Sequence, residues 1–295
     1  MPSLKDLKDR TKSVKSTRKI TQAMKLIATS RYNKFNCQIT AASRYVSDLQ
    51  FVLQKIRTAD HQMFEESIKN WVNTSSKNGK ALLIIFGSDK GLCGSFNTNI
   101  TKVLQKQILG YEQRKTKYKI VCYGNKIAQH VEKYYGNDIL LAQESNNKKI
   151  FTDLHSVSSE LACELLKHVT IKDYSTCDFI YSSHVSAVST SATVQRVLPP
   201  NDSLDKSSND WYDFDNSLET TCDQTMRGLF LAHFYRVYLN SIVSEYSSRM
   251  MAMEHATNNA KNLLAELKMD YNRKRQAYIT KELIEIISGA EAIKV

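Results

Sequence analysis

The chain has 295 residues, 42% of them hydrophobic, and its 41 Lys and Arg residues against 30 Asp and Glu give a formal net charge of +11. This length suffices for one large or two modest domains, and no apolar stretch approaches the ~20 residues that a bilayer-spanning helix needs. The first residues lack the apolar core of a secretory signal, and Asp6 and Asp9 come too early for an acid-poor transit peptide. The basic excess points to an acidic partner, such as nucleic acid, anionic lipid or an acidic protein.

Two long segments at the chain ends contain no internal proline. The first runs from Ser3 to Ile56, and the second runs from Ser217 to Ser288, interrupted only by Gly228. Both are rich in Ala, Leu, Met, Lys, Glu and Arg, which favour helix. A continuous second helix would be roughly 110 Å long at 1.5 Å per residue. Helices of that length are usually coiled coils when they do not span a membrane.

Apolar residues at three- and four-residue spacing predict the faces on which these helices pack. The first segment carries Leu4, Leu7, Thr11 and Val14, after which the apolar stripe shifts to Ile20, Met24 and Ile27. The second carries Met226, Leu229, Phe230, Val237 and Ile242, followed by Met250, Met253, Ala256, Ala260, Leu263, Leu264 and Leu267. We therefore predict that helices from opposite chain ends pack as an antiparallel coiled coil. Polar residues weaken its seam at Thr11, Arg18, Ser244 and Asn258.

Between these segments, short apolar runs alternate with helical ones. Strands are expected over residues 81–86, 119–123, 139–142, 178–183 and 192–198, and helices over 98–109, 126–135 and 152–169. Buried strands that alternate with helices predict a mostly parallel sheet covered by helices. The last two strands are close enough in sequence to pair as a hairpin, and residues 199–216 are expected to form a loop.

The predicted fold class is therefore α/β, with a long antiparallel coiled coil of the N- and C-terminal helices and a central Rossmann-like α/β domain. We place the first helix at residues 1–57, the central domain at 78–200 and the last helix at 215–295. In this arrangement the two chain ends meet, and the central domain hangs from the shaft that they form.

No motif in the sequence predicts catalysis, a cofactor or a metal. The glycine-rich run from Gly87 to Gly94 follows a strand and opens a helix, where a phosphate loop would lie, but it lacks the Gly-Lys-Ser/Thr of a P-loop. A tight turn with glycines at positive φ is the simpler interpretation. The 6 cysteines and 7 histidines show no metal-ligand spacing. An α/β enzyme that uses this turn stays an alternative, and it predicts nucleotide binding by the isolated chain.

Four segments, in the same order along the chain, resemble signature motifs of the gamma subunits of F-type ATP synthases. The C-terminal one begins at Ile279 and matches I-T-x-E-x-x-E-x-x-x-G-A at every position. The others are the run from Ser16 to Lys25, the turn from Ser88 to Asn97 and the helix from Ser247 to Ala260. The resemblance spans the whole chain, although residues 201–216 diverge and the redox-active cysteine insert of chloroplast members is absent.

The resemblance implies a non-catalytic central rotary stalk that couples rotation of a proton-driven c-ring to ATP synthesis or hydrolysis at the beta subunits. It implies no cofactor, no metal and no direct small-molecule substrate. The paired helices are expected to enter a hexameric head of alpha and beta subunits, while the α/β domain is a foot that touches the epsilon subunit and the c-ring. Matching motif positions give the expected contacts between rotor and stator: Met24, Lys25, Arg249, Gln276, Thr280 and Glu282.

A shaft that turns inside a sleeve needs contacts that can be exchanged, so we expect a mostly polar outer surface. The start at Met1 without a presequence resembles bacterial members, which implies a peripheral position on the cytoplasmic face of the bacterial inner membrane. A basic helical nucleic-acid-binding protein is the alternative function, because residues 1–35 hold ten Lys and Arg against two acids. It would need aromatic stacking residues or a recognised reading helix, neither of which is evident, so we expect no nucleic-acid partner.

Overall fold

The computed structural model describes residues 3–73, 79–144, 147–150, 152–186, 189–200 and 217–293. Most of the predicted loop at 199–216 therefore lies outside the described residues. The chain divides into two compact units. The terminal-helix unit combines the chain up to Ala28 with the chain from Met250 onward, and the sheet unit runs from Thr29 to Arg249. Within the described residues, no helix combines the length and the apolar character that crossing a membrane requires.

Two helices that run in opposite directions form the terminal-helix unit. They are the beginning of α1 (Leu4–Asn36) and the end of α8 (Leu218–Ile293). Lys25 Nζ lies 2.8 Å from Glu254 Oε1, and the Thr257 hydroxyl donates to the Thr21 hydroxyl over 2.8 Å. Because residue numbers fall along α8 as they rise along α1, the pair is antiparallel, as the sequence predicts.

The inward face of α1 keeps a heptad spacing up to Ala28. Its buried and half-buried positions include 4, 7, 11, 14, 18, 21, 25 and 28. The predicted shift of the stripe is wrong: Ile20 and Ile27 are 57% and 53% exposed, and Thr21 and Ala28 take the inward places. Regular three- and four-residue steps keep the seam facing its partner. A polar residue is tolerated at Thr21 because Thr257 satisfies its hydroxyl.

The predicted single N-terminal helix is instead divided within the sheet unit. α1 ends at Asn36, α2 spans Ile39–Ala59 and α3 spans His61–Trp71. At the first break, the Gln38 amide donates to the Phe35 carbonyl over 3.0 Å, which is the three-residue bond of a tighter helical turn. Neither Gly nor Pro marks this break, so local propensity alone would continue the helix.

A five-stranded sheet with the order β3-β2-β1-β4-β5 forms the centre of the sheet unit. The strands are β1 (Lys80–Phe86), β2 (Tyr118–Tyr123), β3 (Ile139–Gln143), β4 (Tyr174–His184) and β5 (Thr190–Leu198). The β1–β2, β1–β4 and β2–β3 pairs are parallel, whereas β4 and β5 pair as an antiparallel hairpin. The predicted mostly parallel sheet and its final hairpin are both confirmed.

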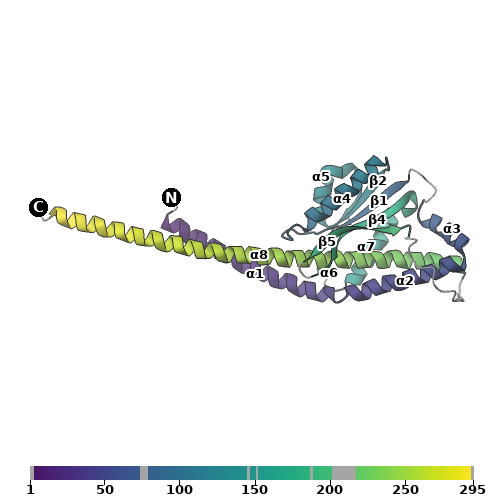
Figure 1. The fold of residues 1–295 in the computed structure, drawn as a ribbon, viewed down its shortest axis with the longest axis horizontal. Helices are drawn as coiled ribbons and strands as arrows, with labels where there is room; N and C mark the ends of the chain where they lie inside the picture. Colours follow the sequence, from purple (N-terminus) through teal and green to yellow (C-terminus); the bar gives the residue numbers. More distant parts are fainter. Residues whose placement is uncertain are drawn as a thin grey trace. The chain divides into compact units, whose positions relative to one another are not determined.

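Helices cover both faces of this sheet (Figure 1). α4 (Phe96–Gln113) and α5 (Asn125–Tyr135) lie on one face. α7 (Leu154–His168) and the first part of α8 lie on the other, and the short α6 (Asn147–Ile150) precedes α7. Every β1 residue from Ala81 to Phe86 is buried, as expected for a central parallel strand with both faces covered.

α8 packs against the sheet through aromatic rings and serine hydroxyls. The ring of Phe234 lies 5.1 Å from that of Phe86 and 5.3 Å from that of Tyr123. Ser241 donates a 3.1 Å hydrogen bond to the Phe86 carbonyl, and Ser244 donates one of 2.9 Å to a carbonyl of β4. The sheet unit thus takes in residues 29–73 and 217–249 as well as the predicted central domain, so its limits differ from the predicted boundaries.

Candidate protein-contact surfaces

Three of the predicted contact residues lie on the last part of α8. Gln276, Thr280 and Glu282 are all exposed. The Thr280 hydroxyl donates to the Gln276 carbonyl over 2.9 Å, one helical turn back. The Glu282 carboxylate accepts a hydrogen bond from Tyr278 and, with its charge, raises the pKa of that phenol. These polar groups bond along their own helix, and their outward faces remain open to a partner.

The same part of α8 exposes a set of large apolar side chains. Those exposed by 46–68% are Met269, Tyr278, Ile279, Leu283, Ile284, Ile286 and Ile287. The expected mostly polar outer surface is therefore wrong for this segment. Exposed apolar side chains concentrated on one segment mark a surface that a partner covers. Near Lys274 α8 reaches the start of α1: hydrogen bonds with Ser3 lower the pKa of Asp6, and the charge of Lys274 lowers it further. α1 begins at Leu4, and among the described residues none from α1 lies beside α8 beyond that point.

α1 also carries exposed apolar side chains outside its seam. Ile20, Leu26 and Ile27 are exposed, and Met24 is half-buried beside them. This is the stripe that the sequence places in the coiled coil. Lys25 faces the seam instead, where its hydrogen bond and charge lower the pKa of Glu254. Of the two predicted contact residues on α1, Met24 borders the outer stripe and Lys25 joins the two helices.

The turn from Ser88 to Asn97 is closed by its own side chains. Asn97 accepts from the Ser88 amide over 3.1 Å and donates to the Ser88 hydroxyl over 2.7 Å. Because the Ser88 amide is already bonded, it is not free to hold a phosphate. Positive φ occurs at Gly94 (60°), as expected, but also at Leu92 (62°), whose side chain is 63% exposed. A left-handed leucine is sterically costly, and its side chain projects away from the turn.

The side chain of Arg249 contacts the backbone of this turn, and the residue is 8% exposed. Its Nη1 atom lies 2.7 Å from Glu245 Oε1, and Nη2 donates to the carbonyls of Lys90 and Gly91 over 3.2 and 3.3 Å. The structure therefore places Arg249 in the sheet unit as a buried residue, whereas Gln276, Thr280 and Glu282 are exposed. Sequence reasoning missed Glu245, although a Glu four residues before an Arg on one helix is a pairing signal.

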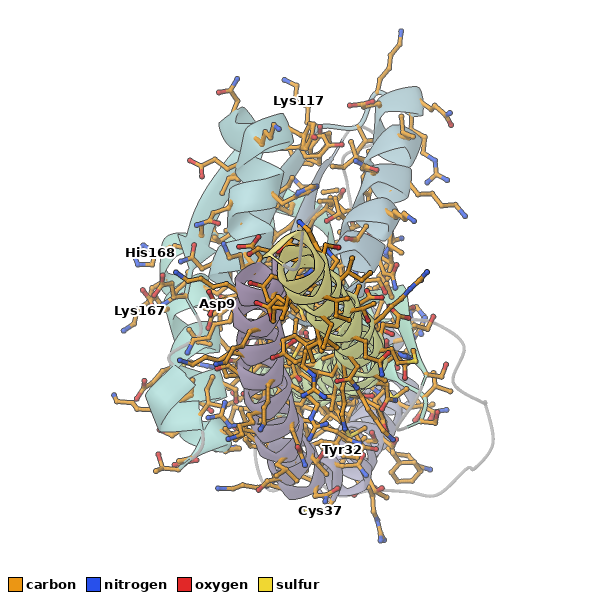
Figure 2. All side chains as sticks on the ribbon, turned by 90° about the vertical axis from the view of Figure 1, so that its left-hand side faces the viewer. Asp9, Tyr32, Cys37, Lys117, Lys167 and His168 are labelled. Atoms are coloured by element: carbon orange, nitrogen blue, oxygen red, sulfur yellow. The ribbon has the colours of Figure 1, made fainter. Side chains whose placement is uncertain are left out.

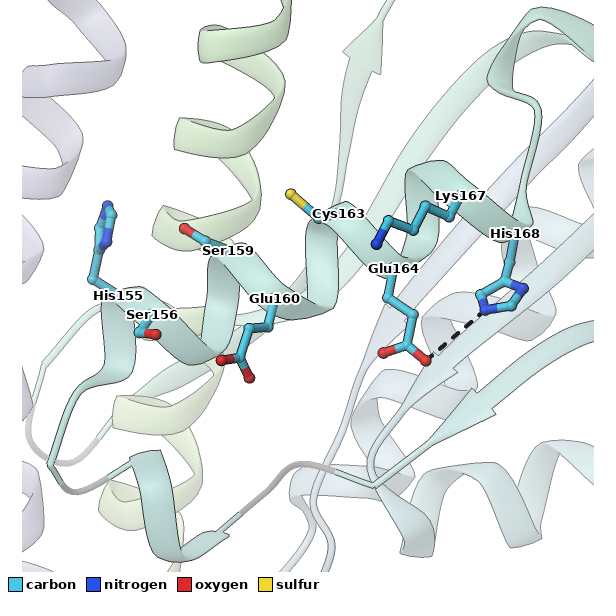
Figure 3. Close-up of a pocket in the computed structure, with 8 residues that line it drawn as sticks. All are labelled: His155, Ser156, Ser159, Glu160, Cys163, Glu164, Lys167 and His168. Carbon is cyan, nitrogen blue, oxygen red and sulfur yellow. Dashed lines mark ion pairs between the residues drawn. The ribbon is translucent and has the colours of Figure 1, made fainter.

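A hollow of about 880 Å³ runs along α7 and is lined by residues of that helix alone. They are His155, Ser156, Ser159, Glu160, Cys163, Glu164, Lys167 and His168 (Figure 3). Lys167 and His168 project into solvent (Figure 2). Within the described residues, no three His, Cys, Asp or Glu side chains are placed to hold a metal ion. The hollow is open, and its side chains do not converge on one point (Figure 3).

Comparisons with known proteins match nearly the whole length of the chain. A family model described as ATP synthase matches residues 3–293. The ATP synthase gamma chain of Rickettsia canadensis is 34% identical, over 99% of this chain and 100% of that protein. The gamma chain of an Anaeromyxobacter species is 32% identical, over 100% of both chains.

Solved structures share the fold. One is the rotor of the Euglena gracilis mitochondrial ATP synthase, with a TM-score of 0.67 and 17% identity over 94% of this chain and 98% of that one. Another is the central stalk and c-ring of the Tetrahymena thermophila mitochondrial enzyme, with a TM-score of 0.57 and 20% identity over 80% and 99%. The predicted fold class is confirmed.

Proposed function

The chain belongs to the ATP synthase gamma-chain family, and we propose from this premise that it is the central-stalk subunit that couples rotation of a c-ring to ATP synthesis or hydrolysis. The nucleic-acid-binding alternative finds no support among its relatives. We further propose that the chain itself is non-catalytic and that its partners are the alpha, beta and epsilon subunits and the c-ring. Its proposed location is the cytoplasmic face of the bacterial inner membrane.

The observation that carries this proposal is the uncovered end of α8. From Arg275 to Ile293 the helix continues for roughly 28 Å at 1.5 Å per residue, with its large apolar side chains exposed from Tyr278 to Ile287. Removing such surface from water is favourable by about 25 cal/mol per Å². A ring of subunits that encloses a single helix would cover all sides of this segment at once, which no flat partner surface would do.

The outer stripe of α1 supports a second region of contact. Ile20, Met24 and Ile27 are spaced for one helix face, and basic residues flank them at Lys15, Lys19 and Lys34. A partner surface that combines apolar and acidic side chains would match both features. We propose that Met24 contacts such a surface directly, and that Lys25 supports it by holding Glu254 across the seam.

Rotation would act through differences between the faces of the shaft. Each catalytic subunit of the head would meet a different face, and a partner's conformational equilibrium shifts only when contacts differ between its states. The exposed surface of the paired helices differs in this way, since α1 exposes the apolar Ile20 and Ile27 whereas α8 exposes polar groups such as Gln276 and Thr280. Contacts that differ in chemistry around the shaft are what such a mechanism requires.

Co-purification tests the proposed function. A tagged full-length chain, expressed in its own cells, should bring down alpha, beta and epsilon subunits together with ATPase activity. Met24→Lys should leave the complex assembled but reduce the protons pumped per ATP hydrolysed. Gln22→Lys, which adds the same charge to another exposed face of α1, is the matched control and should leave pumping unchanged. Capture of nucleic acid in place of these subunits would refute the proposal.

A further inference from the structure

We propose that Arg249 is a positioning residue, which holds the exposed tip of the Ser88–Asn97 turn at Lys90–Leu92 against α8. On this view Arg249 acts in coupling through the tip and does not itself touch a partner. The coupling role rests on the proposed function, whereas the positioning role concerns the sheet unit alone.

The guanidinium of Arg249 bonds to groups within its own chain. One nitrogen pairs with Glu245, and the other donates to two consecutive carbonyls of the tip, at 3.2 and 3.3 Å. The guanidinium carbon also lies 5.5 Å from the centre of the Tyr246 ring. The guanidinium carbon of Arg31 lies at the same distance from that ring. A side chain 8% exposed with these partners has little surface to offer to another subunit.

The tip of the turn is bonded both to its base and to α8: the Ser88 hydroxyl donates to the Lys90 carbonyl over 2.9 Å, and Arg249 provides the link to α8. At the base, Asn97 accepts from the Ser88 amide and donates to the Ser88 hydroxyl. Asp89 also holds the base, by accepting from the Asn125 amide of α5 over 3.0 Å. The tip is joined to α8 by Arg249, through backbone carbonyls that any residue at positions 90 and 91 would supply. Removal of Arg249 should therefore release the Gly91 end of the tip from α8, while the base stays in place and Ser88 still bonds the Lys90 carbonyl.

The tip is built to be presented outward. Lys90, Gly91 and Leu92 are exposed, and Leu92 takes a left-handed backbone that turns its side chain away from the sheet unit. A flexible tip would lose conformational entropy on binding a partner. Holding the tip in advance removes that cost, which is the physical purpose that we assign to Arg249.

Cys93 provides a built-in reporter of tip opening. Its side chain is 3% exposed beneath the tip, and its Sγ atom lies 3.6 Å from both the Ser88 hydroxyl and the Asn97 amide nitrogen. Burial also raises the pKa of this thiol, so the closed form reacts slowly with thiol reagents. The rate of Cys93 labelling therefore measures how often the tip opens.

The experiment measures labelling of Cys93 by a maleimide in the full-length chain, in a Cys37→Ser background because Cys37 is exposed. The double variant Glu245→Gln/Arg249→Met removes the buried ion pair as a unit and so avoids leaving one charge uncompensated. Loss of two hydrogen bonds from a charged donor should speed labelling about tenfold or more. Arg249→Lys, which keeps a cationic donor, should restore most of the protection.

Two controls separate positioning from general loss of stability. Glu245→Gln alone keeps the Arg249 donors and should leave Cys93 protected. Arg227→Gln changes an exposed arginine of the same helix and should have no effect. Labelling of Cys177, which is buried in β4, reports unfolding of the whole sheet unit.

An unchanged Cys93 rate in the double variant, or equal acceleration at Cys93 and Cys177, would overturn the proposal. In the purified complex, the double variant should keep its subunits but pump fewer protons per ATP. Failure of the proposed function would appear separately, as a wild-type chain that captures no ATP synthase subunits, and it would leave the labelling result standing.

Discussion

The hydroxyl of Thr257 donates a 2.8 Å hydrogen bond to the hydroxyl of Thr21, which lies 236 positions earlier in the chain. Both residues occupy inward positions of the antiparallel pair, and Thr21 is buried. A buried polar layer in a seam defines which residues face each other, as single polar residues do in other coiled coils. We interpret this layer as a device for register at some cost in stability.

Replacing both threonines by valine tests that interpretation. Thr21→Val/Thr257→Val should be neutral or stabilising by up to about 1 kcal/mol, because removal of both partners leaves no unsatisfied hydroxyl. Thr21→Val alone should also be mild, since the Thr257 hydroxyl can still donate to the Met253 carbonyl at 2.7 Å. Urea unfolding of the two single variants and the double variant gives the coupling energy. A double variant destabilised by more than about 2 kcal/mol would mean that the layer contributes stability.

His233 makes the sheet unit sensitive to acid. Burial, followed by the charge of Arg236, lowers the pKa of His233 from 6.5 to about 3. Its Nδ1 atom lies 3.3 Å from the Gln195 amide nitrogen, and its Nε2 atom lies 3.4 Å from the Gln50 amide nitrogen. Between pH 6.5 and pH 3 the unfolded chain binds a proton that the folded chain does not, so stability falls as pH falls through this window.

The size of this effect follows from the pKa shift. Lowering the pH from 6.5 to 5 should reduce the free energy of unfolding by about 1.5 kcal/mol through this residue alone. His233→Gln removes the titration, so the stability difference between wild type and variant should change by that amount over the same range. Chemical denaturation at both pH values measures it. Parallel pH profiles for the two proteins would show that His233 does not titrate as described.

Asp178 is the most enclosed acid of the β4–β5 hairpin, at 1% exposed. Arg196 donates to both carboxylate oxygens, over 2.9 and 3.2 Å, and the Tyr111 hydroxyl donates to one of them. Arg196→Met should therefore destabilise the chain by about 3 kcal/mol or more, because it leaves a buried carboxylate without its counter-charge. The measurement is the free energy of unfolding in urea.

A more exposed ion pair provides the matched control. Lys119 Nζ lies 3.1 Å from Asp138 Oδ1, and both side chains are about one-third exposed to solvent. Lys119→Met should cost less than about 1 kcal/mol, as solvent-exposed pairs generally do. Equal costs for the two substitutions would contradict the assignment of Asp178 as an enclosed charge that depends on its arginine.

The apolar end of α8 should matter for assembly and not for folding. Leu283→Gln/Ile287→Gln changes two exposed side chains one turn apart, so the stability of the isolated chain should change by less than about 0.5 kcal/mol. Binding to the alpha and beta subunits should weaken at least tenfold, which titration with a labelled chain would detect. Leu109→Gln removes an equally exposed leucine on α4 and should leave binding intact.

Much of the fold follows from local sequence. The absence of proline from Leu218 to Ile293 predicts one helix, and Gly228 does not break it. The continuous apolar run from Ala81 to Phe86 predicts a central strand buried on both faces, which the structure confirms. These features are set by periodicity and composition over many residues, so single exceptions do not change the outcome.

Other features depend on tertiary contacts that no local pattern records. Nothing at Gln38 signals the end of α1, and the break there is accompanied by a 3.1 Å hydrogen bond from Tyr235 to the Gln38 side chain, 197 positions away. The stripe through Ile20 and Ile27 has the spacing of a seam but faces outward. Periodicity shows that a helix has an apolar face, but it cannot show which partner covers that face.

The predicted contact residues divide in the same way. Gln276, Thr280 and Glu282 lie on an exposed helix, as a contact surface requires, and their role stays a prediction. Arg249 belongs to another of the family motifs, the helix from Ser247 to Ala260, and is bonded to the Lys90 and Gly91 carbonyls. A motif identifies positions that matter, but burial decides whether a residue acts by touching a partner or by holding a neighbour.

The central claim is that this chain turns inside a head of alpha and beta subunits, and rotation can be observed directly. A bead attached to Lys102→Cys, an exposed position on α4, in a Cys37→Ser background would report movement relative to an immobilised head. Addition of ATP should produce continuous rotation in one direction that stops when ATP is removed. A head that hydrolyses ATP while the bead stays still, or only fluctuates in both directions, would contradict the claim.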